Sequence, residues 1–220
     1  MRILGVLFDL NGVLVDSLNL HAQAWSKALT MNKHPISKEE LRSHSQFGKY
    51  GGVELVKLLN QDISDNLAQK IEEDYEKEYR GLAEKHLKSF PDAEETLKHL
   101  DGMGLKLGII ANDKRETIEK DLAKVGLKDY FEVLTGLDEV KKGKPSPEMI
   151  VLACKRLFMK PYHAFVIGDS TSEMIAAKQV LSLSIGVTTG ACTAEELKEA
   201  GAQFIVDKLI EIVPIIERFG

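Results

Sequence analysis

Long hydrophobic runs are missing from this sequence of 220 residues. Its apolar stretches end after a few residues, well short of the ~20 that a membrane-spanning helix needs. The N-terminal segment MRILGVLF is too short for the hydrophobic part of a secretory signal and carries no small-residue cleavage site. These absences predict a cytoplasmic protein without a membrane partner.

The chain also has few cysteines and no excess of positive charge. The two cysteines, Cys154 and Cys192, lie far apart and match no metal-ligand spacing, which favours buried free thiols. The formal net charge of −5 gives no reason to expect nucleic acid or an anionic membrane as a partner. The remaining composition, 44% hydrophobic and 29% charged, indicates one medium globular domain, or one domain with an insert.

Short apolar runs alternate with helical patterns along most of the chain. The runs typical of strands cover residues 3–8, 106–110, 131–135, 164–168 and 183–187, with a weaker one at 203–206. Helical patterns follow at about 115–125, 147–158, 172–180, 193–199 and 209–218. This alternation predicts an α/β fold with a parallel, Rossmann-like sheet flanked by helices.

The first predicted strand is separated from the others by a helical insert. From Leu18 apolar residues recur at intervals of three and four, through His21 and Trp25, with Ser17 as a candidate N-cap. The chain stays helical and polar to about residue 88, without a strand-like run. We therefore expect a core of residues 1–15 and 89–220 and a helical subdomain of residues 16–88.

Polar residues stand where four predicted strands end, and ligands of parallel sheets bind at that edge. Each short motif is weak alone, since an Asp after a strand is more often a turn or helix cap and a lone lysine is usually solvated. The order and spacing of the whole set is not explained in that way. The set comprises Asp9-Leu10-Asn11-Gly12, Ala111-Asn112-Asp113, Lys144 in KKGKPSPE, and Asp169 and Glu173 in GDSTSE.

Together these motifs resemble the haloacid dehalogenase superfamily, in the branch with a small helical cap after the first strand. The branch includes sugar-phosphate and phosphoglycolate phosphatases and β-phosphoglucomutase. The segment FDLNGVLVDS is similar to the family's D-x-D-G-V-L-x-D-S, and LGIIAND, GKPSPE and VIGDSTSEMIAA stand at its other three motifs. LNLHAQAW, with His21 and Trp25, fits the entry into the cap. The resemblance covers essentially the whole chain.

The resemblance implies a Mg²⁺-dependent phosphatase that acts on a small phosphorylated metabolite, such as a sugar phosphate or phosphoglycolate. Asp9 is the expected nucleophile, forming an aspartyl phosphate, and Lys144 is expected on the phosphoryl oxygens. The metal ligands implied are Asp9, the backbone carbonyl of Asn11, and Asp169, with Glu173 either binding through water or holding Lys144. The backbone of Leu10, Gly12, Ala111 and Asn112 is expected to cradle the phosphate.

Two residues of the insert are weaker candidates for substrate binding. Lys49, in the segment HSQFGKYGG, is expected either to meet an anionic substrate group or to be a solvated turn residue. His21 is expected either to reach the cleft or to pack beside Trp25. The aromatic stripe of Tyr75 and Tyr79 is expected to be cap core.

Two residues depart from the family pattern. Asn11 stands where its phosphatases and mutases have an Asp that protonates the leaving group, a role that an amide cannot fill and that is typically worth ~10²–10⁴-fold in rate. Ala111 stands where a Thr or Ser hydroxyl would bind the phosphate. Three explanations of Asn11 remain open: a deliberate substitution that slows turnover, which we favour, a native residue of a slow enzyme, or a binding protein without catalysis.

Other activities of the superfamily are alternatives. A phosphonate hydrolase would need an imine-forming lysine in the cap, for which Lys49 is the candidate. A β-phosphoglucomutase-like mutase is less favoured, because Gly51 falls near the position of the mutase's loop arginine. A haloacid dehalogenase is disfavoured by the acid-rich GDSTSE. A non-catalytic module that binds a phosphometabolite also stays open, as does the choice between a monomer and a small homo-oligomer.

Overall fold

The computed structural model describes residues 2–43, 52–59 and 63–219. Among them, six parallel strands form one sheet in the order β3-β2-β1-β4-β5-β6. The strands are β1 (Gly5–Phe8), β2 (Lys106–Ile110), β3 (Val133–Thr135), β4 (Ala164–Gly168), β5 (Leu183–Val187) and β6 (Phe204–Val206). The expected α/β fold with a parallel sheet is confirmed.

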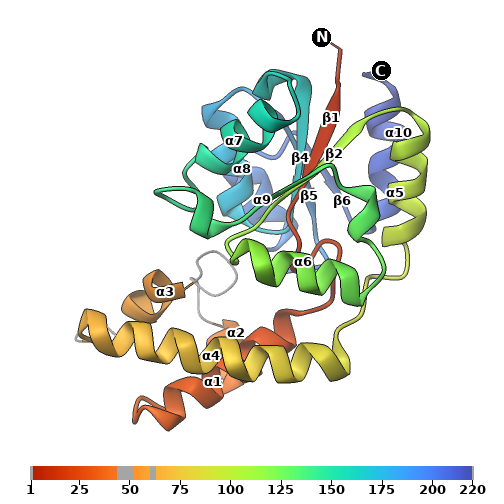
Figure 1. Cartoon of the computed structure of the whole chain (residues 1–220). Helices are drawn as coiled ribbons and strands as arrows, with labels where there is room; N and C mark the ends of the chain where they lie inside the picture. The colour runs from red at the N-terminus through yellow and green to blue at the C-terminus, as the bar shows by residue number, and fades with distance from the viewer. Residues whose placement is uncertain (1, 44–51, 60–62, 220) are drawn as a thin grey trace.

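Helices cover both faces of this sheet, as Figure 1 shows. The core helices are α5 (Ala93–Gly102), α6 (Arg115–Lys124), α7 (Glu148–Arg156), α8 (Thr171–Gln179), α9 (Ala194–Ala200) and α10 (Ile212–Glu217). Short 3-10 turns are η1 (Lys128–Tyr130), η2 (Leu137–Glu139), η3 (Pro161–His163) and η4 (Leu209–Glu211). The expected helix at 209–218 is thus a 3-10 turn followed by α10, and Phe131 and Glu132 precede β3 instead of belonging to it.

The central strand explains why the sheet could be identified from apolar runs. All four residues of β1 are buried. Leu7 packs with the cluster on one face, while Val6 and Phe8 pack with the cluster on the other. A strand that is covered on both faces has no reason to alternate polar and apolar residues, so it appears as a continuous run.

The insert forms a separate helical layer below the carboxyl edge of the sheet (Figure 1). Its helices are α1 (Leu18–Met31), α2 (Lys38–Ser43), α3 (Gly52–Leu59) and α4 (Asp65–His86). Trp25 of α1 stacks on Tyr75 of α4 with ring centroids 3.8 Å apart. Aromatic stacking of this kind holds the two long helices together.

Two chain segments connect the helical layer to the sheet, and they lie side by side. Val15 and Ser89 form an antiparallel bridge. The amide of Asp16 donates to the carbonyl of Lys88 at 2.9 Å, and that of Phe90 to the carbonyl of Leu14 at 2.9 Å. The two connections therefore form a short paired hinge beside the carboxyl end of β1.

Candidate active site

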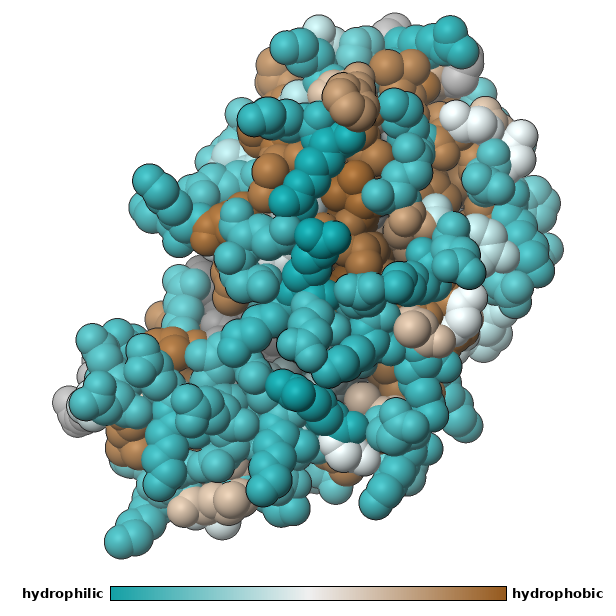
Figure 2. All heavy atoms as spheres, viewed as in Figure 1, coloured by the Kyte–Doolittle hydropathy of each residue, from teal (hydrophilic) through white to brown (hydrophobic). Residues whose placement is uncertain are grey.

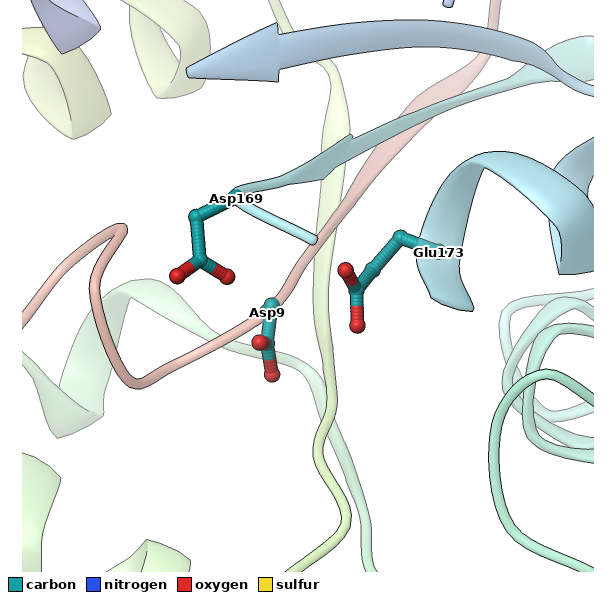
Figure 3. A group of neighbouring side chains, drawn as sticks. All are labelled: Asp9, Asp169 and Glu173. Carbon is teal, nitrogen blue, oxygen red and sulfur yellow. The ribbon is translucent and has the colours of Figure 1, made fainter. Parts of the chain in front are cut away.

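Three carboxylates meet at the carboxyl edge of the sheet (Figure 3). Asp9 follows β1, Asp169 follows β4, and Glu173 lies in the first turn of α8. One oxygen of each lies within 4.8 Å of the others, and the exposed fractions are 6%, 1% and 1%. Carboxylates gathered this closely without water need a cation among them, because desolvation and mutual repulsion both oppose their ionisation.

Lys144 provides a positive charge at this cluster. Its ammonium Nζ lies 2.8 Å from Oδ1 of Asp9 and 2.6 Å from Oε1 of Glu173. Asn112 fixes the lysine backbone, because its Oδ1 accepts from the Lys144 amide at 2.9 Å and its Nδ2 donates to the Lys144 carbonyl at 3.2 Å. Burial would lower the pKa of Lys144, but the two carboxylates raise it above its ordinary value, so the ammonium stays charged.

Glu173 is held by its own helix terminus. Its Oε2 accepts from the amide of Ser170 at 3.0 Å and from the hydroxyl of Ser170 at 2.7 Å, forming a capping box. Its Oε1 accepts from the hydroxyl of Ser172 at 2.9 Å as well as from Lys144. Burial alone would raise the pKa of Glu173, yet Lys144 and the serine donors lower it. Of the two expected positions, Glu173 adopts the one beside Lys144.

Asp169 and Asp9 are less compensated. Burial, with Asp9 and Glu173 nearby, raises the pKa of Asp169 well above its ordinary value. Its Oδ2 accepts from the Ala191 amide at 2.7 Å. Burial also raises the pKa of Asp9 to about 7, although Lys144 opposes the shift. The ammonium of Lys144 therefore compensates these two acids only in part, which is the electrostatic condition for binding a further cation.

Two glycines leave the space that Asp169 occupies. Gly12 has a positive φ of 77°, and a Cβ built there would lie 2.3 Å from Oδ2 of Asp169. A Cβ on Gly190 would lie 1.8 Å from the same oxygen. The hydroxyl of Thr189 donates to the carbonyl of Gly12 at 2.6 Å and ties the two loops together. Gly12 thus serves both the left-handed turn and the approach of the carboxylate.

Asn11 lies beside the cluster in a network of its own. Its Oδ1 accepts from the Ser17 hydroxyl at 2.6 Å and lies 3.0 Å from Nε2 of His21. Its Nδ2 donates to Oδ2 of Asp113 at 2.6 Å. Ser17 occupies the N-cap position of α1, but its side chain makes no capping bond. The expectation of a capping Ser17 is wrong in this respect, because the hydroxyl binds Asn11.

His21 links Asn11 to the helical layer. Its Nδ1 lies 2.6 Å from the hydroxyl of Tyr75, and its ring stacks on Tyr79 with centroids 4.1 Å apart. Burial lowers the pKa of His21, although the charge of Asp113 opposes the shift. Neutral His21 can donate from Nε2 to Asn11 and accept at Nδ1 from Tyr75. His21 therefore packs among aromatic rings and contacts Asn11 beside the carboxylate cluster.

A family model for haloacid dehalogenase-like hydrolases matches residues 6–187. The chain belongs to this family. Phosphoglycolate phosphatase of Salmonella typhimurium is 29% identical over 235 residues, which cover 98% of this chain and 93% of the relative. Pyrophosphatase PpaX of Oceanobacillus iheyensis is 24% identical over 216 residues, which cover 98% of both chains. The crystal structure of a hydrolase from Pseudomonas syringae, 27% identical, has a TM-score of 0.87 and covers 98% of this chain and 99% of its own.

The resemblance to the family is thereby confirmed, and with it the expectation of a hydrolase. Among the helices that the structure describes, none is long and apolar enough to cross a bilayer.

The structure does not bring every expected residue of this hydrolase to the site. Lys49 lies outside the described residues. Ala111 is buried and contributes no hydroxyl, and its amide donates to the carbonyl of Thr135 at 3.1 Å. Leu10 is buried as well, so only its backbone could serve a ligand.

Asp113 has a role that the sequence did not suggest. It directly follows Asn112 at a strand exit, and that position was the only signal in the sequence. Its contact with Asn11 joins segments that are 102 residues apart. The amide Nδ2 of Asn11 matches the carboxylate of Asp113, where an aspartate at position 11 would face it with like charge.

Proposed function

We propose that the chain is a Mg²⁺-dependent phosphatase that hydrolyses a small phosphate monoester through an aspartyl phosphate on Asp9. The observation that carries the proposal is the ion pair of Asp9 and Lys144, with Asp169 and Glu173 around it at the edge of the sheet. Residues 16–88 would act as the cap that covers this edge.

In the first step a carboxylate oxygen of Asp9 would attack phosphorus while the bond to the alcohol oxygen breaks. Lys144 would hold a phosphoryl oxygen and balance its charge, with Glu173 fixing the direction of the ammonium. In the second step water would attack the phosphorus of the aspartyl phosphate, which releases inorganic phosphate and restores Asp9.

The donor set fits a hard divalent cation. The carboxylates of Asp9 and Asp169 converge, and Gly12 and Gly190 leave the space that lets the Asp169 carboxylate take this position. A bound Mg²⁺ would neutralise charge on the phosphate and on these two acids. Glu173 uses both of its oxygens for Lys144 and the serines, so we assign it to positioning Lys144.

Asn11 would weaken turnover without closing the site. Its amide has no proton to give to the departing alcohol, so that proton would have to come from water. The fit of Asn11 between Ser17, His21 and Asp113 supports the hypothesis that Asn11 is the native residue of a slow enzyme. This support stands against the deliberate substitution that the sequence alone favours.

The proposal is tested with p-nitrophenyl phosphate and Mg²⁺. We expect Asn11→Asp to raise kcat by about 100-fold or more, since general acid–base help is worth ~10²–10⁴. The double variant Asn11→Asp/Asp113→Asn exchanges acid and amide and keeps a hydrogen bond between the positions, so it should retain the gain.

The control is Asp9→Asn in the Asn11→Asp background, which should abolish activity because it removes the nucleophile. If neither the original chain nor Asn11→Asp hydrolyses any phosphate ester, while phosphate esters still bind, the protein is a binding module and the phosphatase proposal is wrong.

A further inference from the structure

A pocket of about 220 Å³ lies between the helical layer and the core, beside Asn11. Helix α4 contributes Glu72, Tyr75, Glu76 and Tyr79, and the core contributes the segment from Asn112 to Lys114 with Thr117, Leu137 and Asp138. Its volume suits a fragment of a few heavy atoms, which is the size of a small leaving group and not of a macromolecular partner.

Two residues that line the pocket belong to the hydrogen-bond network around Asn11. Asp113, in its lining, accepts the hydrogen bond from Nδ2 of Asn11 at 2.6 Å, and Tyr75, also in its lining, contacts His21, which contacts Asn11. In the proposed reaction position 11 faces the alcohol oxygen that leaves phosphorus. The group attached to that oxygen therefore extends toward this pocket.

Negative charge predominates in the lining. Four acids line the pocket, Glu72, Glu76, Asp113 and Asp138, against one base, Lys114. Lys114 forms an ion pair with Glu76 and lies 4.0 Å from Glu72, so its charge is already shared by two carboxylates. Hydrophilic residues also cover the outer face of α4 that Figure 2 shows.

We infer that this pocket takes the leaving group of the substrate and selects a phosphate monoester whose leaving group carries a positive charge over one with a negative charge. The inference rests on the proposed function. It sets the chain apart from the relatives named for phosphoglycolate and pyrophosphate, whose leaving groups are anionic, because an additional carboxylate or phosphate would face the acids of the pocket.

Three esters of similar size separate charge from shape: 2-aminoethyl phosphate, 2-hydroxyethyl phosphate and carboxymethyl phosphate. We expect kcat/KM of the Asn11→Asp variant at pH 8 with Mg²⁺ to fall in that order, by roughly 3- to 10-fold per step for a screened charge at this range. Added salt should narrow the differences, since screening weakens them.

Glu72→Gln tests whether the pocket causes the preference among the three esters, because it removes one charge from the lining with little change in size. It should reduce the ratio of aminoethyl to carboxymethyl phosphate about threefold, and Glu72→Lys, which changes the charge by two units, should reduce this ratio further. The matched control is Glu73→Gln, which removes the same charge from an exposed neighbour on α4 outside the pocket and should leave the ratio unchanged.

Calorimetric titration of the unaltered chain with each ester separates this inference from the proposed function. If neither the unaltered chain nor Asn11→Asp hydrolyses any ester, but aminoethyl phosphate binds more tightly than carboxymethyl phosphate, the phosphatase proposal is wrong and the charge preference of the pocket stands. If the three esters are hydrolysed with equal kcat/KM, or if carboxymethyl phosphate is preferred, the inferred charge preference of the pocket is wrong and the phosphatase proposal stands. Neither binding nor hydrolysis would overturn both.

Discussion

The two walls of the cleft are built in opposite ways. The core wall, formed by Asp9, Lys144, Asp169 and Glu173, is almost completely buried, with an ammonium between two of its carboxylates. On the cap wall, the part of α4 that faces the pocket, the side chains of Glu72 and Glu76 are 20% and 18% exposed. Lys114 of the core lies near both glutamates, and Arg80 of α4 also pairs with Glu76 at 3.5 Å. Charge is fixed by a network on one wall and left in excess on the other.

This difference separates two functions of the site, because the core wall holds the reacting groups and the cap wall would determine which substrate is preferred. The core wall draws its residues from three strand exits and a helix terminus, so a change in one of them disturbs the others. The glutamates of the cap wall project from a single helix, and one can be exchanged without moving the reacting groups. The following predictions test this contrast, from the largest expected effect to the smallest.

Lys144→Met should cause the largest loss, because it leaves Asp9 and Glu173 buried without their cation. Removing one partner of a buried ion pair typically costs ~3–5 kcal/mol of unfolding free energy. The variant also removes the positive charge that Lys144 would place beside the phosphoryl oxygens. We therefore expect kcat of the Asn11→Asp variant to fall by at least ~10²-fold. Urea unfolding without metal and steady-state kinetics measure the two effects.

Lys142→Met is the matched control for this prediction. Lys142 lies two positions earlier in the same loop, and it is exposed. It should leave both the unfolding free energy and the rate nearly unchanged. A loss of less than ~1 kcal/mol for Lys144→Met would show that the carboxylates of the core wall do not depend on it.

Gly12→Ala should disturb the core wall through its backbone. The new Cβ would meet Oδ2 of Asp169 at 2.3 Å, at a residue whose φ of 77° already disfavours a side chain. Gly104→Ala is the control, since its φ is 71° and nothing lies within 4 Å of a Cβ there. Left-handed strain alone costs ~1–2 kcal/mol. Gly12→Ala should lose that and ~1–3 kcal/mol more from the clash.

The measurements are urea unfolding for both variants and Mg²⁺-dependent activity in the Asn11→Asp background. Activity should fall at least ~10²-fold for Gly12→Ala, because Asp169 must move, and should stay unchanged for Gly104→Ala. Equal losses in the two variants would mean that the approach of Asp169 to Gly12 has no role in the site.

The same contrast explains how much the sequence could predict. Strands such as β1 were recognisable because both of their faces are buried, and parallel strands bring their carboxyl ends together. The meeting of Asp9 and Asp169 follows from those two facts, whereas Lys144 lies beyond η2, in the loop before α7. The first strand, expected at residues 3–8, begins at Gly5, since the boundary depends on pairing partners and not on hydrophobicity alone.

The contacts around Asn11 were beyond reach, because they depend on side-chain directions across the two layers. Ser17 has the residue type and position of an N-cap, yet its hydroxyl donates to Asn11 and makes no capping hydrogen bond. Glu72 carries no motif, and the segment LGIIAND, which ends at Asp113, does not indicate the partner of that residue. Only the packing of α4 against the loop after β2 places Asp113 and Glu72 on one pocket. For Glu173 the sequence left two roles open, and its capping box and its contact with Lys144 support the role of holding the lysine.

Asp121→Asn should have the smallest effect, at a contact between the helical layer and the core. Tyr79 of α4 donates to Oδ2 of Asp121 on α6 at 2.6 Å, and burial raises the pKa of Asp121 to about 7, although this hydrogen bond opposes the shift. A carboxyl group with a raised pKa in the folded state stabilises the fold below its unfolded pKa, ~3.9, and loses that contribution as the pH rises toward 7. Asparagine keeps the acceptor and cannot ionise.

The unfolding free energy of Asp121→Asn relative to the original chain should therefore increase by about 1–3 kcal/mol between pH 4 and pH 8. Urea unfolding at several pH values measures this difference. Asp101→Asn, at an exposed residue of α5, is the control and should give a constant difference. If Asp121→Asn also gives a constant difference, Asp121 is ionised in the folded protein throughout this range. Tyr79 would then donate its hydrogen bond to an ionised carboxylate, so the contact between the two layers would be charged like the core wall.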